Sequence, residues 1–260
     1  PGVFIPALAL ALSLFAGSGA PQEPLPRNDQ RRAFGHIVDY DGDGTSDPSA
    51  FSIETRTLHG MGGLERSWKS AFAFRLPVPA DYNGDGKTEI AFFDGGMWHV
   101  YGHLITRFGE KGDWPVPGDY DGDGKADLAL WRPGSGVWLL SDDLQTSWGD
   151  SADIPVPQDY DGDGRTDIAV WRPKEGAWYI KYSGGEPAFV SWGSEGDIPV
   201  PGDYDGDGKC DPAVWRPKEA KWHIRGREPV SLGRPADIPL AWNIWILWAK
   251  KLVGPPSGEN

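Results

Sequence analysis

The residues with the clearest chemistry in this chain are the carboxylates of a nine-residue motif that occurs five times. The motif reads Asp-Tyr-Asp-Gly-Asp-Gly-x-x-Asp, with Asn and Glu replacing two of the aspartates in the second copy, and it begins at Asp39, Asp81, Asp119, Asp159 and Asp203. Four carboxylates within nine residues repel one another, so packing alone does not favour such a segment. A hard cation with oxygen ligands removes this repulsion, and each copy therefore predicts a calcium site.

The glycines and the residue after the motif distinguish this loop from another well-known calcium loop. Glycine at positions 4 and 6 permits a tight, partly left-handed turn in which the alternating aspartates point inward. An EF-hand loop needs a bidentate glutamate at position 12. Position 12 is apolar in every copy, which excludes the EF-hand: Ala50, Phe92, Leu130, Val170 and Val214.

The intervals between the motifs predict a repeat architecture. Consecutive copies begin 42, 38, 40 and 44 residues apart, a period shared by propeller blades and by two-helix solenoid repeats. Each unit is rich in Gly, Pro, Trp and β-branched residues and sustains no helical apolar period, which favours short strands. The predicted fold class is therefore all-β.

Four short apolar runs follow one another in each unit, as the fourth unit illustrates. Ile168–Trp171 follows the loop, Trp178–Ile180 alternates a fixed Trp and aliphatic residue with a variable one, and a third run ends at Trp192-Gly193. The last run, Ile198–Pro201, contains two prolines and must be an edge or a very short strand, because proline cannot donate to a ladder. Four antiparallel strands in about 40 residues fit a β-propeller blade.

These loops, together with the Ala-Val-Trp, Gly-x-Trp and Trp-Gly or Phe-Gly sequences, resemble FG-GAP/VCBS repeats. Such repeats are the calcium-binding blades of the integrin α-chain head and of many bacterial secreted proteins, and the resemblance covers about residues 34–240. It implies that the loop joins the first two strands of a blade, and that side chains at positions 1, 3, 5 and 9 bind the metal with the backbone carbonyl at position 7. The implied ligands are Asp39, Asp41, Asp43, Thr45 and Asp47; Asp81, Asn83, Asp85, Lys87 and Glu89; Asp119, Asp121, Asp123, Lys125 and Asp127; Asp159, Asp161, Asp163, Arg165 and Asp167; and Asp203, Asp205, Asp207, Lys209 and Asp211.

The charge balance agrees with up to five bound calcium ions. The chain has 38 acidic and 25 basic residues, and five Ca²⁺ ions would change its net charge from −13 to about −3. Asn83 removes one charge from the second loop and Glu89 has a longer reach, so we expect this loop to be the weakest or the most Mg²⁺-tolerant. We expect the calcium to be mainly structural.

The ends of the chain differ from the repeats. Val3 to Phe15 is an apolar run followed by Ser18-Gly19-Ala20, so residues 1–20 are predicted to be a signal peptide, or an N-terminal anchor in the alternative. Residues 21–33 read as a linker and residues 34–260 as the propeller, with no transmembrane span in the mature chain. Cys210 is the single cysteine and has no intrachain disulfide partner.

The number of blades stays open. Asp237–Leu240 begins a sixth unit, but no acidic loop follows at Asn243, which predicts either a degenerate last blade or the truncated end of a longer propeller. Rings in the resembled family commonly have seven blades, so an incomplete ring is one reading. Its exposed edge strands would favour oligomerisation. The first unit carries an insertion between Phe51 and Phe74.

Catalysis is not expected of this chain. Its five histidines share no motif, no nucleophile or phosphate-binding motif is present, and the acidic balance disfavours nucleic acid. Arg132, Arg172 and Arg216 each follow a Trp, and such pairs would suit sugar stacking; the alternative, favoured by the strict register, is that the tryptophans form the core between blades.

These observations predict a secreted or cell-surface calcium-binding β-propeller that acts in adhesion or recognition of a carbohydrate or protein partner. The alternatives are a strict lectin and a purely structural module of a larger extracellular protein.

Overall fold

The computed structural model describes residues 49–52, 57–60, 65–67, 76–141 and 144–234. The predicted signal peptide, the linker, the first acidic loop and the degenerate C-terminal unit lie outside the described residues. Every regular element in the described residues is a β-strand. These residues contain no helix long and apolar enough to cross a membrane.

The described strands form five antiparallel sheets. Residues 49–67 contribute a three-stranded sheet of β1 (Ser49–Ser52), β2 (Thr57–Gly60) and β3 (Glu65–Ser67). The other four sheets have four strands each, in the following order along the chain. They are β4 (Leu76–Pro77), β5 (Ala91–Asp94), β6 (Met97–Val100) and β7 (Leu104–Arg107); β8 (Trp114–Pro115), β9 (Ala129–Arg132), β10 (Val137–Leu140) and β11 (Gln145–Ser147); β12 (Ile154–Pro155), β13 (Ile168–Arg172), β14 (Ala177–Lys181) and β15 (Ala188–Ser191); and β16 (Ile198–Pro199), β17 (Ala213–Arg216), β18 (Lys221–Ile224) and β19 (Val230–Ser231).

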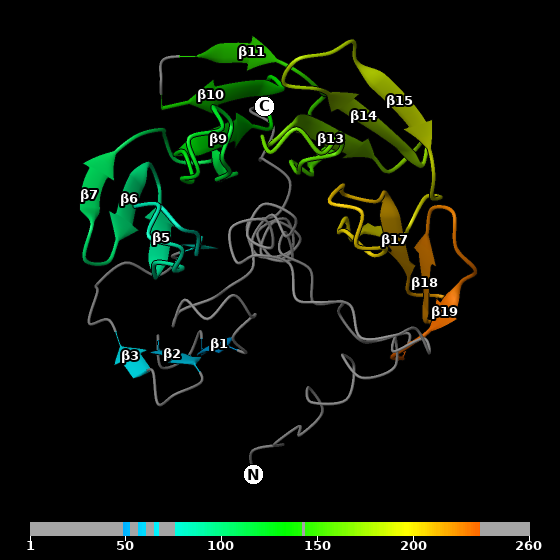
Figure 1. Cartoon of the computed structure of the whole chain (residues 1–260), viewed down its shortest axis with the longest axis horizontal. Helices are drawn as coiled ribbons and strands as arrows, with labels where there is room; N and C mark the ends of the chain where they lie inside the picture. The colour runs from blue at the N-terminus through cyan, green and yellow to red at the C-terminus, as the bar shows by residue number, and fades with distance from the viewer. Residues whose placement is uncertain (1–48, 53–56, 61–64, 68–75, 142–143, 235–260) are drawn as a thin grey trace, which may run out of the picture.

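Consecutive sheets follow one another around an arc (Figure 1). Each four-stranded sheet pairs its strands in chain order, with β5, β9, β13 and β17 toward the centre of the arc and β7, β11, β15 and β19 at its outside (Figure 1). This is the blade arrangement of a propeller, and it confirms the predicted fold class. The described sheets do not by themselves close a ring.

The short proline strand is the first strand of a blade rather than the last. Ile154 and Pro155 of β12 pair with Trp171 and Val170 of β13, on the far side of the acidic loop. The strand is two residues long and lies at the edge of its sheet, as the prolines predict. The predicted runs are therefore found within two residues, but the boundary between units shifts by one strand.

The core is built from tryptophans at fixed positions on the two middle strands. Trp138 and Trp178 are fully buried, and the alternating burial of β10 shows that every second side chain faces the interior. The Trp178 indole N–H donates to the Trp192 carbonyl at 2.9 Å within its blade, and the Trp192 indole N–H donates to the His223 carbonyl of the next blade at 2.9 Å. The tryptophans thus form the core between blades, as their register indicates.

Candidate metal centre

The acidic loop joins the first two strands in each of the four four-stranded sheets. The loops are named here by their order in the sequence: loop 2 is residues 81–89, loop 3 is 119–127, loop 4 is 159–167 and loop 5 is 203–211. The residue before each loop pairs with position 9, as Gln158 pairs with Asp167 in loop 4 through an N–H to carbonyl hydrogen bond of 2.8 Å. This pair closes the loop at the point where the two strands diverge.

The aspartate at position 1 organises the loop from within. In loop 4, Asp159 Oδ1 accepts the Gly162 N–H at 2.6 Å and Oδ2 accepts the Gly164 N–H at 2.9 Å. Both glycines have a positive φ, +79° and +86°, which other residues rarely adopt. The two glycines of the motif are therefore required by the turn that brings their amides to one carboxylate.

The tyrosine at position 2 anchors the loop to the blade, a role that the sequence analysis did not assign. The Tyr160 N–H donates to Asp167 Oδ2 at 2.8 Å, and the Tyr160 hydroxyl donates to the Val156 carbonyl at 2.7 Å. The Tyr160 ring packs edge-on against Trp178, with 6.4 Å between the ring centres. Tyr82, Tyr120 and Tyr204 make the same two hydrogen bonds in their own loops. The constant tyrosine of the motif was the signal for this contact.

Three carboxylates converge in every described loop, with one oxygen of each lying within 4.8 Å of the others. In loops 3 to 5 they come from positions 1, 3 and 9, and in loop 2 from positions 1, 5 and 9. A donor set made only of carboxylate oxygens fits a hard cation such as Ca²⁺. The groups are Asp81, Asp85 and Glu89; Asp119, Asp121 and Asp127; Asp159, Asp161 and Asp167; and Asp203, Asp205 and Asp211.

In the described loops 3 to 5 the acids at position 5, Asp123, Asp163 and Asp207, lie outside these groups. Asp123 Oδ1 accepts the Lys125 N–H at 2.9 Å while Oδ2 pairs with the Lys125 ammonium at 3.2 Å. Asp163 accepts the hydroxyl of Ser183, which comes from the turn between β14 and β15. The position 5 acids of loops 3 and 4 thus bond within their loop and to a neighbouring turn.

Loop 2 differs in the way its sequence suggests. The Asn83 amide nitrogen donates to Glu89 Oε1 at 2.7 Å, and the Tyr82 N–H donates to Glu89 Oε2 at 2.8 Å. An amide donor therefore faces the carboxylates where the other loops have a third acid. Asn83 brings no negative charge to the cluster, so loop 2 keeps the prediction of the weakest calcium binding.

The converging carboxylates are electrostatically strained without a cation. Burial raises the pKa of Asp167 to about 7, with the nearby Asp161 and Asp159 carboxylates adding to the effect. Burial likewise raises the pKa of Asp127 to about 6, and it raises the pKa of Asp119 and Asp159. A bound divalent cation would offset both the desolvation and the repulsion.

These shifts predict an inverted pH dependence for the metal-free protein. A carboxyl whose folded pKa lies above its unfolded value contributes stability at low pH, and that stability is lost as pH rises through the folded pKa. For Asp127 and Asp167 the loss falls between about pH 4 and pH 7. Thermal melts of metal-stripped protein should therefore give a higher melting temperature at pH 5 than at pH 8.

In millimolar calcium the melting temperature should instead be higher at pH 8 than at pH 5, because calcium binds the deprotonated carboxylates. Asp127→Asn and Asp167→Asn should each flatten the metal-free pH dependence. A metal-free melting temperature that rises from pH 5 to pH 8 would contradict the electrostatic account of the loops.

A second repeated constellation, which the sequence analysis missed, consists of a buried aspartate and an arginine. Arg172 binds Asp153 through two parallel hydrogen bonds, Nε to Oδ1 at 2.8 Å and an Nη to Oδ2 at 2.9 Å. Arg132 with Asp113 and Arg216 with Asp197 repeat this geometry. Each aspartate precedes the proline strand of its blade, so the pair ties the first strand to the end of the second.

These ion pairs correct the proposal that the Trp-Arg sequences bind sugars by stacking. Each guanidinium is held by an aspartate, and that of Arg172 also lies 4.4 Å from the ring centre of Tyr179. Trp131, Trp171 and Trp215 are at most 1% exposed, so none of them offers a face to a sugar. These arginines pair, and these tryptophans pack, within the blades.

The structure is that of a blade-repeat protein of the propeller type. It has four-stranded antiparallel sheets in succession, each with an acidic loop between its first two strands. A family model described as an FG-GAP-like repeat matches residues 159–214, from the start of loop 4 into β17. No curated protein and no solved structure matches the chain. Residues 159–214 are thus an FG-GAP-like repeat, and the repeated sheets fit an FG-GAP repeat protein, as the loop and tryptophan motifs predict.

Proposed function

We propose that this protein is a calcium-stabilised β-propeller module that acts outside the cell, by adhesion or recognition rather than catalysis. The observation that supports the proposal best is the recurrence of one acidic loop in four successive sheets, with three converging carboxylates in each. A single cluster would suit a local site, whereas a cluster in each of the four described four-stranded blades suits a metal that holds the fold. FG-GAP repeats are typical of extracellular proteins, and extracellular calcium modules bind at about 10⁻⁴–10⁻³ M.

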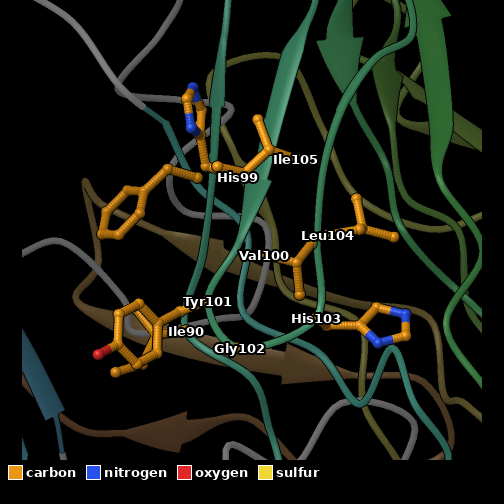
Figure 2. Close-up of a pocket in the computed structure, with 9 residues that line it drawn as sticks. Ile90, His99, Val100, Tyr101, Gly102, His103, Leu104 and Ile105 are labelled. Carbon is orange, nitrogen blue, oxygen red and sulfur yellow. The ribbon is translucent and has the colours of Figure 1, made fainter.

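A hollow beside β6 and β7 offers a place for a carbohydrate or protein partner (Figure 2). It has a volume of about 360 Å³, and its lining includes Ile90, His99, Tyr101, His103 and Ile105. Tyr101 is 58% and Ile105 71% exposed, so aromatic and apolar surface lies open to solvent beside imidazole groups. An apolar lining with a few polar groups is the usual composition of a ligand pocket.

Binding of the fluorescently tagged full chain to a glycan array and to an extracellular protein array, in calcium and in chelator, tests the proposal. We expect calcium-dependent binding that Tyr101→Ala weakens by at least about tenfold, since exposed aromatics often dominate an interface. Gln145→Ala, an exposed position on β11, is the matched control and should bind normally.

A glycan signal would identify a lectin and a protein signal an adhesion module. No binding to either array would contradict adhesion or recognition and would favour a purely structural module.

A further inference from the structure

Neighbouring acidic loops are joined by a backbone hydrogen bond that repeats from blade to blade. The N–H at position 8 of one loop donates to the carbonyl at position 1 of the loop before it. Ala126 binds Asp81 at 2.7 Å, Thr166 binds Asp119 at 2.6 Å and Cys210 binds Asp159 at 2.8 Å. Three such bonds connect loops 2, 3, 4 and 5 in series.

Each of these bonds joins a residue of one carboxylate cluster to the chain neighbour of a residue in the next cluster. The acceptor carbonyl belongs to a position 1 aspartate, whose own carboxylate lies in the earlier cluster. The donor precedes the position 9 aspartate, whose carboxylate lies in the later cluster. Asp159 is the acceptor for loop 5, for example, and Cys210 is followed directly by Asp211. Successive clusters are therefore connected through one hydrogen bond and one step along the chain.

Side chains reinforce the connection at two further positions. The basic residue at position 7 lies over the position 4 glycine of the preceding loop, so that a Cβ at Gly122 would come within 2.9 Å of Arg165 Nε, and one at Gly162 within 3.1 Å of Lys209 Cγ. The thiol of Cys210 packs against the position 2 Tyr160 of loop 4 in the buried core. The glycine at position 4 thus provides room for the neighbouring loop as well as a left-handed turn.

We propose that neighbouring loops bind calcium with positive cooperativity, each loaded loop raising the affinity of the loops on either side of it. The proposal rests on the calcium binding of the proposed function. An ion that fixes the position 1 aspartate also fixes its backbone carbonyl, to which the next loop donates a hydrogen bond. Part of the next loop is therefore already ordered when its own ion binds, so that binding costs less conformational entropy. Coupling of this kind is reciprocal and acts in both directions along the series.

Hydrogen–deuterium exchange of the full chain over a calcium series, read by mass spectrometry for each loop, tests this coupling. Asp161→Ala removes a carboxylate from loop 4 only. We expect the calcium concentration for half-maximal protection of loops 3 and 5 to rise about fivefold, the lower end of common coupling factors. Loop 2, whose hydrogen bond runs to loop 3, should change by less than about twofold.

The reciprocal variant is Asp121→Ala in loop 3. It should raise the calcium concentration for half-maximal protection of loops 2 and 4 and leave that of loop 5 nearly unchanged. Glu186→Ala, an exposed acid outside the loops, is the control and should leave every midpoint unchanged. Unchanged midpoints at loops 3 and 5 in Asp161→Ala, or an equal shift at all loops, would overturn the coupling. A wild-type chain without calcium-dependent protection would overturn the proposed function as well, and so the two failures are distinguishable.

Discussion

Replacing Arg172 with alanine is expected to lower the free energy of unfolding by about 3 kcal/mol, because it leaves a buried carboxylate without its cation. Asp153 is fully buried, and Arg172 supplies two of the hydrogen bonds to its oxygens. One other donor to the same carboxylate, the Asp150 N–H at 2.8 Å, stays in place, which limits the loss. Guanidinium chloride unfolding in the presence of calcium measures the difference.

Lys174→Ala is the matched control for this substitution. Lys174 is an exposed cation in the turn that follows Arg172, and its removal should change stability by less than about 0.5 kcal/mol. In the double variant Asp153→Ala/Arg172→Ala the cost should be smaller than the sum of the two single costs, because neither partner is left alone. Equal effects of Arg172→Ala and Lys174→Ala would show that the pair contributes nothing to the blade.

Removal of calcium is expected to have the largest effect on stability. An ion that binds only the folded chain adds about 1.4 kcal/mol per site at ten times its dissociation constant, so the four described loops together would add about 6 kcal/mol. For a chain of this length we expect the melting temperature to rise by more than about 10 °C between chelator and millimolar calcium. Differential scanning calorimetry measures this change.

Magnesium at the same concentration is the control for this melt. Mg²⁺ demands a near-ideal octahedral shell and gives up its water reluctantly, so it should stabilise the chain much less. Identical melting temperatures in calcium and in chelator would mean that the acidic loops do not clamp the blades.

The repeated loops and strands were predictable because their signals are local. Glycines at positions 4 and 6 and alternating acids fix the loop, and β13 begins at the predicted Ile168. The blade to which the proline strand belongs was not predictable from the repeat period, because a period does not show where a repeating unit starts. Pro155 pairs across the loop with Val170, a contact that only the folded sheet reveals.

The aspartate–arginine pairs were missed although the sequence contains a signal for them. An Asp stands directly before the proline strand in three blades, always 19 residues before the arginine, as Asp153 is before Arg172. In the preceding unit the corresponding residues are Arg75 and Asp94, so the two charges are exchanged. The hydrogen bonds between loops left no such signal, because backbone groups are the same in every residue.

The most direct test of the central claim is a count of the calcium ions that the chain binds. Metal-stripped protein would be dialysed to equilibrium against millimolar calcium, and the bound metal measured by atomic emission. The account predicts at least four ions per chain, one for each described loop, and a fifth if residues 39–47 bind as their sequence predicts. Fewer than four ions per chain at saturating calcium would contradict it.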